Sequence, residues 1–236
     1  MFLPIYLAIS TQEFANILEF PSTLCYFACH FSPSGEGLSN LPTILQPGSI
    51  LSIDDSTPIA GHSKNKVIEQ IKYLTRKFNP CGILLDFQRP DNPFSVDMIE
   101  SILEGTQCPV AVSHIYAREL DCPVFLPPLP YRITVQEYLN PWSGREIWLE
   151  LGNEKEMAIV TQTEFCTERV HTIPNERNYF RDPSLLCHYC TYIKPDHIAF
   201  YFQRTAEDLA EIQAQAQALG ASKFVGLWQQ LRQFYS

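Results

Sequence analysis

The sequence lacks three features that would suggest particular partners or locations. It has no run rich in Lys and Arg, and its formal net charge is -9, so binding to nucleic acid or to an anionic membrane is disfavoured. It has no apolar stretch of the roughly 18 residues needed to span a membrane. Its first ten residues lack basic side chains and are interrupted by Pro4, which predicts a first strand there and not a signal peptide.

Motifs typical of several common enzyme mechanisms are also missing. The sequence contains neither HExxH nor GxSxG, and no Gly-rich loop suited to a phosphate is present. Cys187 and Cys190 have the spacing of metal ligands, but zinc needs four ligands and no second pair occurs at a familiar spacing. Cys166, His171 and His197 are irregularly spaced. We therefore expect neither a metal nor a cofactor.

The eight cysteines do not require a disulfide framework. Such frameworks are typical of small secreted domains, whereas this chain has 236 residues, enough for one globular domain with a sizeable core. Five cysteines lie in or just before predicted strands, where a reduced Cys packs as a small apolar residue; they are residues 25, 29, 81, 108 and 122. We expect a reduced protein of the cytoplasm.

Apolar runs alternate with amphipathic segments through the first half of the chain, as in parallel α/β folds. Residues 64–78, for example, place Val67, Ile68, Ile71 and Leu74 on one helical face. Eight strands are predicted, at residues 3–9, 24–31, 49–54, 82–87, 109–113, 122–126, 197–202 and 223–228. This count favours a single (β/α)8 TIM-like barrel domain over residues 1–236. A doubly wound open sheet is the alternative, which the lack of a Gly-rich dinucleotide loop after the first strand disfavours.

The alternation becomes irregular in the second half. The segment between Ser113 and Pro123 is too short for a full crossover helix, so we expect at least one helix to be missing between the fifth and sixth strands. Residues 146–160 have the pattern of a β-hairpin. We assign this hairpin to an insertion in the barrel, at about residues 128–182.

The stretch Cys81–Pro90 is the most informative part of the sequence, because an apolar strand ends there directly in polar residues. Alternation along the strand places Asp86 and Gln88 on one face, and barrel sites lie at the carboxyl ends of strands. The preceding strand ends in Asp54 and Asp55. Asp86 with one of these two carboxylates would form a catalytic acid/base pair. The alternative is that Asp54 and Asp55 only cap a turn.

Further polar and aromatic side chains are expected at the same mouth as ligand-binding residues, because they lie at or just after predicted strand ends. Besides Gln88, they are Arg89, His30, His114, Tyr201, Gln203, Trp228 and Gln230. A single His in such a place is more often structural, and Trp228 is as readily explained as a core residue. Together these groups suit a polyhydroxylated ligand better than a lipid or a nucleotide.

Residues 81–90 resemble the fourth-strand signature of family-18 glycoside hydrolases (chitinases and relatives), written D-G-x-D-x-D-x-E. Gly82 and Asp86 match that signature. Two shorter segments are similar to motifs of the same family in the same order: Leu51–Asp55 to the third-strand S-x-G-G motif, and Val225–Trp228 to the last strand, whose Trp forms the floor of a sugar subsite.

This resemblance implies a barrel fold and glycan binding, with Asp86 at the position that orients the acetamide group of the substrate. It does not imply chitinase activity, because Gln88 stands where the family has its proton-donating Glu. Cys81 and Leu84 replace two further acids of the signature.

Three functions are therefore considered. The first is a barrel that binds a small-molecule or oligosaccharide ligand at its mouth without chitinase activity. The second is an active glycosidase that uses Asp54 or Asp55 with Asp86. The third is a protein-interaction scaffold that uses the insertion, where exposed Trp142 and Trp148 would favour an interface.

Overall fold

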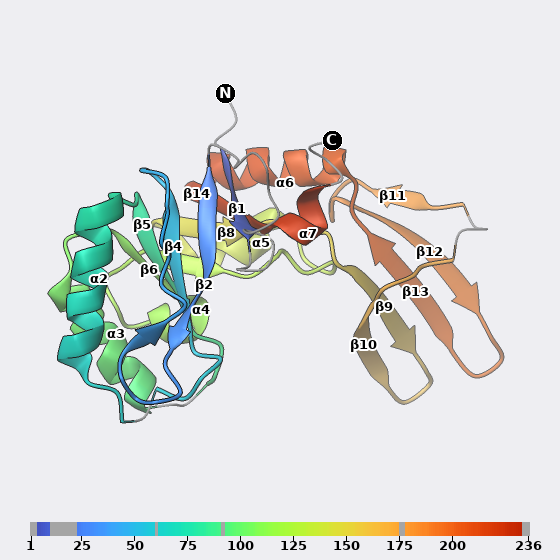
Figure 1. Ribbon diagram of the computed structural model, residues 1–236. Coiled ribbons are helices and arrows are strands. Elements are labelled where there is room, and N and C mark those ends of the chain that lie inside the picture. The colour runs from blue at the N-terminus through green and yellow to red at the C-terminus, as the bar shows by residue number, and fades with distance from the viewer. Residues whose placement is uncertain (1–3, 10–22, 60, 91–92, 175–177, 233–236) are drawn as a thin grey trace.

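The structure is a computed structural model that describes residues 4–9, 23–59, 61–90, 93–174 and 178–232. A closed parallel β-barrel forms one side of the molecule, and a five-stranded antiparallel sheet stands beside it (Figure 1). The barrel confirms the predicted TIM-like fold. Among the described residues, no helix has the length and apolar composition needed to cross a membrane.

Eight parallel strands form the barrel, and pairing of the first two strands closes it. In order around the barrel they are β1 (Ile5–Ile9), β14 (Ala221–Leu227), β8 (Ile147–Glu150), β7 (Val124–Leu126), β6 (Val110–Ser113), β5 (Gly82–Asp86), β4 (Ile50–Asp54) and β2 (Leu24–Phe31). The two-residue strand β3 (Leu38–Ser39) pairs antiparallel with the end of β2.

The barrel interior is filled by one buried side chain from each of its eight strands. They are Ala8, Cys25, Ile50, Leu84, Ala111, Phe125, Trp148 and Val225. Trp148 is fully buried and lies against Gly82, where an added Cβ would overlap the indole ring. Trp148 is therefore not exposed, so it cannot contribute to the protein interface considered for the scaffold function.

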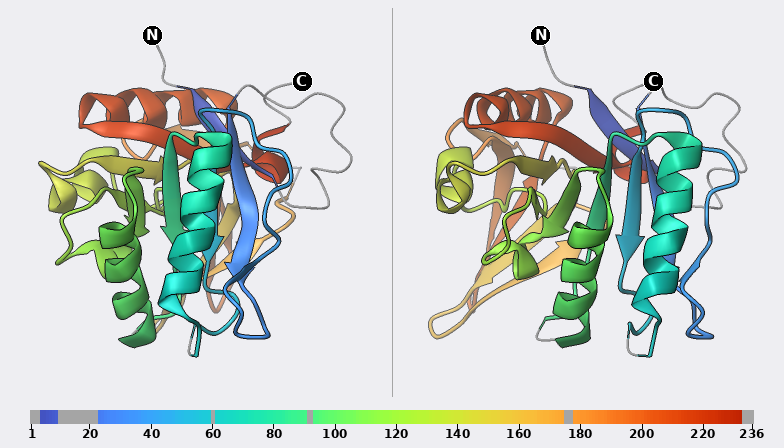
Figure 2. Two further views of the ribbon diagram at one scale, coloured as in Figure 1. Left: turned by 60° about the vertical axis from the view of Figure 1, so that its left-hand side comes forward. Right: turned by 90° about the vertical axis from the view of Figure 1, so that its left-hand side faces the viewer.

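Helices cover the outer face of the barrel unevenly. They are α2 (Lys64–Phe78), α3 (Pro93–Gly105), α4 (His114–Ala117), α5 (Val135–Leu139), α6 (Ala206–Ala218) and α7 (Trp228–Leu231), with a 3-10 turn η1 (Asn140–Trp142) after α5. Helices α2 and α3 lie side by side along the barrel (Figure 2). Only the four-residue α4 connects β6 to β7, which confirms that a full helix is missing between the fifth and sixth barrel strands.

The antiparallel sheet is inserted between the seventh and eighth barrel strands. Its order is β10-β9-β13-β12-β11, and its strands are β9 (Lys155–Val160), β10 (Phe165–Val170), β11 (Phe180–Asp182), β12 (Cys187–Ile193) and β13 (Ile198–Gln203).

Three predictions made from the sequence are wrong in this region. Residues 197–202 do not form a barrel strand, because β13 pairs antiparallel with β9 and β12. Residues 146–160 do not form a hairpin, because β8 pairs parallel with β7 and β14 while β9 belongs to the other sheet. The inserted strands therefore span Lys155–Gln203 and not about 128–182. The loop between β8 and β9 is short enough to mimic a hairpin turn, which explains the error.

Candidate functional site at the barrel mouth

The carboxyl ends of β4 and β5 bring two predicted acids together. Asp54 and Asp86 are register partners on these neighbouring parallel strands, so their Cα atoms lie about 5 Å apart. Both residues are half-buried. The Asp54 carboxylate accepts the main-chain N–H of Ser56 at 2.8 Å, and the Asp86 carboxylate accepts a hydrogen bond from the Gln88 amide.

Asp55 has a different environment from Asp54. Its side chain is buried, with 3% exposure, and its two carboxylate oxygens accept the main-chain N–H groups of Gln88 at 2.9 Å and Arg89 at 3.0 Å. Asp55 thus fastens the loop after β5 to the loop after β4. This arrangement combines the two interpretations drawn from the sequence, since Asp55 holds a turn and Asp54 remains at the mouth.

Gln88 and Arg89 are exposed on this fastened loop. The Arg89 guanidinium donates to the carbonyl of Ser56, and the Tyr116 hydroxyl donates to the carbonyl of Arg89. The loop after β5 is therefore held from two sides, which fixes the Gln88 amide beside Asp86.

Glu150, at the end of β8, is an acid of the mouth that the sequence analysis missed. The residue is half-buried and pairs in register with Val225 of β14. The pKa of Glu150 is raised to about 8, chiefly by burial and also by the negative charges of Asp86 and Glu154, while Arg169 lowers it. An acid directly after the apolar run Ile147–Leu149 was the available signal, but that run was assigned to a hairpin.

The pKa of Asp86 is also raised, to about 6, chiefly by burial. The hydrogen bond from Gln88 lowers this pKa, and the charges of Asp54 and Asp55 raise it. At pH 7 Asp86 is therefore mainly ionised while Glu150 is mainly protonated. Two carboxyl groups whose pKa values are separated in this way form a potential acid/base pair.

Tyr138 of α5 contributes to the same region. Its hydroxyl donates to the carbonyl of Pro127, which follows β7, at 2.8 Å. Burial raises the pKa of Tyr138, and the negative charge of Glu150 raises it further. The phenol therefore remains a neutral hydrogen-bonding group near Glu150.

The structure places three predicted ligand-binding residues on other barrel strand ends or the segments that follow them. His30 on β2 is a register partner of Asp54. His114 begins α4; burial lowers its pKa, with a further contribution from Arg118. Trp228 begins α7 and is half-buried against the hydrophobic core.

Gln230 of α7 contacts the segment that follows β8. Its amide oxygen accepts the N–H of Asn153 at 3.0 Å, and its amide nitrogen donates to Glu154 at 3.2 Å. Gln230 thus joins the segment after the last barrel strand to the segment after β8.

Tyr201 and Gln203 are not at a barrel strand end, contrary to the prediction. Both lie on β13 of the inserted sheet, where Tyr201 forms an edge-to-face contact with Tyr192 at a centroid distance of 5.6 Å. Their placement follows from the reassignment of residues 197–202.

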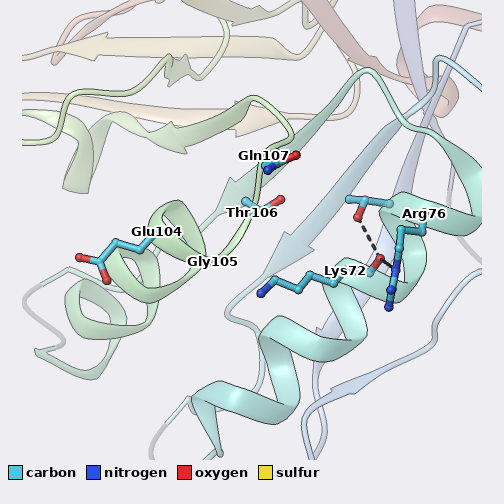
Figure 3. Close-up of a pocket in the computed structure, with 7 residues that line it drawn as sticks. Lys72, Arg76, Glu104, Gly105, Thr106 and Gln107 are labelled. Carbon is cyan, nitrogen blue, oxygen red and sulfur yellow. Dashed lines mark hydrogen bonds between the residues drawn. The ribbon is translucent and has the colours of Figure 1, made fainter.

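Two cavities lie at opposite ends of the barrel. One, of about 270 Å³, lies beside the mouth between the segment after β7 and the inserted sheet. The other, of about 410 Å³, lies between α2 and the end of α3 and includes Lys72, Arg76 and Gln107 (Figure 3). Because the carboxyl ends of these helices lead into the amino ends of β5 and β6, the second cavity is at the opposite end of the barrel from Asp86.

No protein-family model matches the sequence, and no curated protein matches it. In the part of the chain that the structure describes, no group of three or more His, Cys, Asp or Glu side chains is placed to hold a metal ion.

Several solved structures share the fold at low sequence identity. The spore cortex-lytic enzyme SleL of Bacillus cereus is 12% identical with a TM-score of 0.55, over 87% of this chain and 63% of that chain. The spore cortex-lytic enzyme SleL of Bacillus megaterium is 10% identical with a TM-score of 0.55, over 95% of this chain and 69% of that chain. A chitinase of Chromobacterium violaceum is 7% identical with a TM-score of 0.54, over 94% and 93%.

This chain thus spans less than two thirds of the length of the Bacillus cereus enzyme. The predicted resemblance to chitinase-like proteins is confirmed at the level of the fold. The protein has the parallel (β/α)8 barrel shared by these cortex-lytic enzymes and this chitinase, with an antiparallel sheet inserted before the last barrel strand.

Proposed function

We propose that this protein binds an oligosaccharide at the carboxyl-end mouth of its barrel. The observation that carries the proposal is that Asp86 and Glu150 lie at the carboxyl ends of β5 and β8, close enough for the charge of Asp86 to raise the pKa of Glu150. The Gln88 amide and the Tyr138 hydroxyl add neutral hydrogen-bonding groups. Carboxylates, amides and hydroxyls are the groups with which proteins orient polyhydroxylated ligands.

The proposed partner is a sugar chain, and neither nucleic acid nor a membrane is part of the proposal. A net charge of -9 disfavours both. The similar structures include a chitinase and enzymes that lyse spore cortex, which supports an oligosaccharide of the chitin type as the first ligand to test. All eight cysteines are free thiols, in keeping with a proposed role in the reducing cytoplasm.

Cleavage of chitin oligosaccharides by the chitinase mechanism is not part of the proposal. A neutral amide cannot protonate a leaving oxygen, and Gln88 occupies the position of the proton donor in the resembling signature. The Gln88 amide instead donates to Asp86. We expect no turnover of chitotetraose, and turnover that Gln88→Ala abolishes would contradict this expectation.

A second candidate function is hydrolysis that uses Glu150 as the proton donor and Asp86 as the ionised partner. It is favoured by the separation of their pKa values, about 8 for Glu150 and about 6 for Asp86. Such an enzyme should be most active between these two values and lose activity on either side. A bell-shaped pH profile for release of a sugar from a glycoside panel would support this function over binding alone.

Calorimetric titration with chitotetraose tests the binding proposal. Asp86→Asn keeps the shape of the side chain and should weaken binding by about tenfold, since a charge-assisted hydrogen bond contributes about 1.5–3 kcal/mol. Glu150→Gln replaces a mainly protonated acid by an amide and should weaken binding less. Asp97→Asn, which alters an exposed carboxylate on α3, should leave the affinity unchanged. Equal affinities for all four proteins, or no binding by the wild type, would refute the proposal.

A further inference from the structure

The cavity beside the mouth is a groove with a mixed lining, here named the Arg204 groove. It is lined by residues 127–132, Gly152, Glu154, Lys155, Glu156, Arg169 and Arg204, and has a volume of about 270 Å³. Three of its residues, Pro127, Pro128 and Pro130, form a wall with restricted backbone freedom. A space of this size accommodates a substituent or a single sugar, and not a whole oligosaccharide.

The groove adjoins the acids of the mouth. Its Pro127 accepts the hydrogen bond of Tyr138, and its Glu154 and Arg169 both influence the pKa of Glu150. Gln230, which was predicted to bind ligand, donates to Glu154. A ligand bound over Glu150 would therefore have its next group within reach of the groove.

The charge of the groove is opposite to that of the mouth. Four of its lining side chains are cationic and two are acidic, although the whole protein has a net charge of -9. Arg169 binds Glu154 with contacts of 2.8 and 2.9 Å, so that these two charges cancel. Arg132 approaches Glu156 only to 3.9 Å, beyond hydrogen-bond distance.

Arg204 is the buried cation of the groove. Its side chain is 5% exposed, and its guanidinium donates to the carbonyl oxygens of Leu129 at 2.6 Å, Leu186 at 3.2 Å and Pro130 at 3.3 Å. Within the described part of the chain, no carboxylate lies within ion-pair distance of Arg204 or of Lys155. A buried cation without a carboxylate is costly unless an anion offsets its charge.

An aromatic stack supports the Arg204 guanidinium. The Tyr131 ring is 5% exposed, stacks on Phe202 at a centroid distance of 5.5 Å and lies beneath the guanidinium at 4.2 Å. This stack holds the buried cation in place at the groove.

We infer that the Arg204 groove binds a carboxylate group carried by the oligosaccharide, so that the ligand is an acidic glycan. This inference rests on the proposed function, because the mouth would hold the sugar next to the carboxylate. The acids of the mouth repel a carboxylate, whereas the neighbouring groove attracts one. The two sites together select a sugar chain whose anionic group is offset from the unit held over Asp86 and Glu150.

Three matched probes test the inference by calorimetry: chitotetraose, the same tetrasaccharide oxidised to carry carboxylates at C6, and the methyl ester of that product. The acid should bind about tenfold more tightly than the other two at about 50 mM salt. The advantage should shrink at about 300 mM salt, because exposed charges are then screened. Equal affinities for the acid and its methyl ester would overturn the inference.

Protein variants locate the preference. The double variant with Arg132→Gln and Lys155→Gln removes the groove cations that no hydrogen bond to the described residues holds, whereas the donors of Arg204 are taken by carbonyl oxygens. It should lower the preference for the acid to within about twofold. Lys194→Gln, which alters an exposed cation on the β12–β13 turn, should retain the preference. A preference that survives in the double variant would place the carboxylate elsewhere and overturn the assignment to this groove.

A titration of the free groove separates this inference from the proposed function. Glucuronate, followed by amide NMR, should shift the signals of Arg132 and Lys155, whereas glucose should not. Shifts with glucuronate but no binding of any tetrasaccharide would retain the anion site and refute the oligosaccharide proposal. No shifts, together with equal affinities for the acid and its ester, would refute the anion site alone.

Discussion

Asp54 and Asp55 are adjacent in the sequence but have different partners in the structure. Asp54 ends β4 at the mouth beside Asp86 and accepts one main-chain N–H. Asp55 is buried and accepts two, from Gln88 and Arg89. Alternation along an extended chain sends neighbouring side chains to opposite sides, so one acid faces the mouth and the next fastens the loop that carries Gln88.

Replacing Asp55 should therefore affect stability more than replacing Asp54. Asp55→Asn leaves one main-chain N–H without an acceptor and should lower the free energy of unfolding by about 1–3 kcal/mol. Asp54→Asn should cost less than about 1 kcal/mol, because its single acceptor contact can be kept by the amide oxygen. Urea unfolding of both variants measures the difference, and an equal loss would show that the two-point attachment of Asp55 is unimportant.

The pKa of Glu150 should make stability depend on pH. Because this pKa is about 8 in the folded protein, above its ordinary value, folding favours the protonated form; the contribution is complete below about pH 4.5 and is lost as the pH rises through 8. Glu150→Gln removes that loss, so the variant should gain about 1–3 kcal/mol relative to the wild type between pH 5 and pH 9.

Glu137→Gln provides the contrast for this measurement. Hydrogen bonds from Thr134 hold the pKa of Glu137 below its ordinary value, so its contribution to stability is constant above about pH 5 and is lost only as the pH falls below about 4.5. Thermal unfolding of the three proteins from about pH 3 to pH 9 should therefore show the effect of Glu137→Gln at the acid end and that of Glu150→Gln at the alkaline end. A wild type and a Glu150→Gln variant whose unfolding curves shift in parallel would contradict the raised pKa of Glu150.

At the scale of single elements, the start of α6 fastens the inserted sheet to the barrel side of the molecule. Asp208 is fully buried and forms a capping box with Thr205. The same carboxylate binds Arg181 of β11 at 3.1 Å and His188 of β12 at 2.9 Å. Burial would raise the pKa of Asp208, but these hydrogen bonds outweigh that effect and hold it below its ordinary value.

Asp208→Ala should therefore be among the more destabilising single substitutions. It removes the helix cap and leaves Arg181 and His188 without their shared carboxylate, with an expected loss of about 3–5 kcal/mol. Asp196→Ala removes the exposed partner of His197 and should cost less than about 1 kcal/mol. Chemical unfolding measures the free energy of unfolding of both variants. A loss below about 1 kcal/mol for Asp208→Ala would show that the inserted sheet is held mainly by packing.

Element prediction succeeded where the local pattern was decisive. Helix α2 has the predicted bounds Lys64–Phe78, because Val67, Ile71 and Leu74 recur on one face at helical spacing. The pattern was ambiguous at Ile147–Glu150 and Ile198–Gln203, because an apolar strand looks the same in either sheet. Strand partners depend on tertiary pairing. Glu150 was missed and Tyr201 was misplaced for this one reason, whereas Asp86 was placed at a barrel strand end because its strand was identified correctly.

At the scale of the molecule, the two sheets should differ in how far the rest of the protein depends on them. Replacing residues 155–203 with a short Gly-Ser linker should leave a cooperatively folded barrel of lower stability, since all eight barrel strands remain. Deleting residues 221–236 should abolish cooperative unfolding, because β14 pairs with both β1 and β8 and buries Phe224 completely. Thermal unfolding followed by circular dichroism tests both variants. Cooperative unfolding after deletion of residues 221–236 would show that the barrel does not need closure.

The position of β14 also determines when the protein can complete its fold on the ribosome. Strands β1 and β8 have a shared neighbour that is synthesised after all the other barrel strands, so neither can be covered on that side until β14 has emerged. The inserted sheet pairs strands that are mostly close in sequence and can form earlier. The nascent chain therefore carries two open parallel edges next to an already ordered sheet, and these edges are where aggregation or chaperone binding would be concentrated until β14 has emerged from the ribosome.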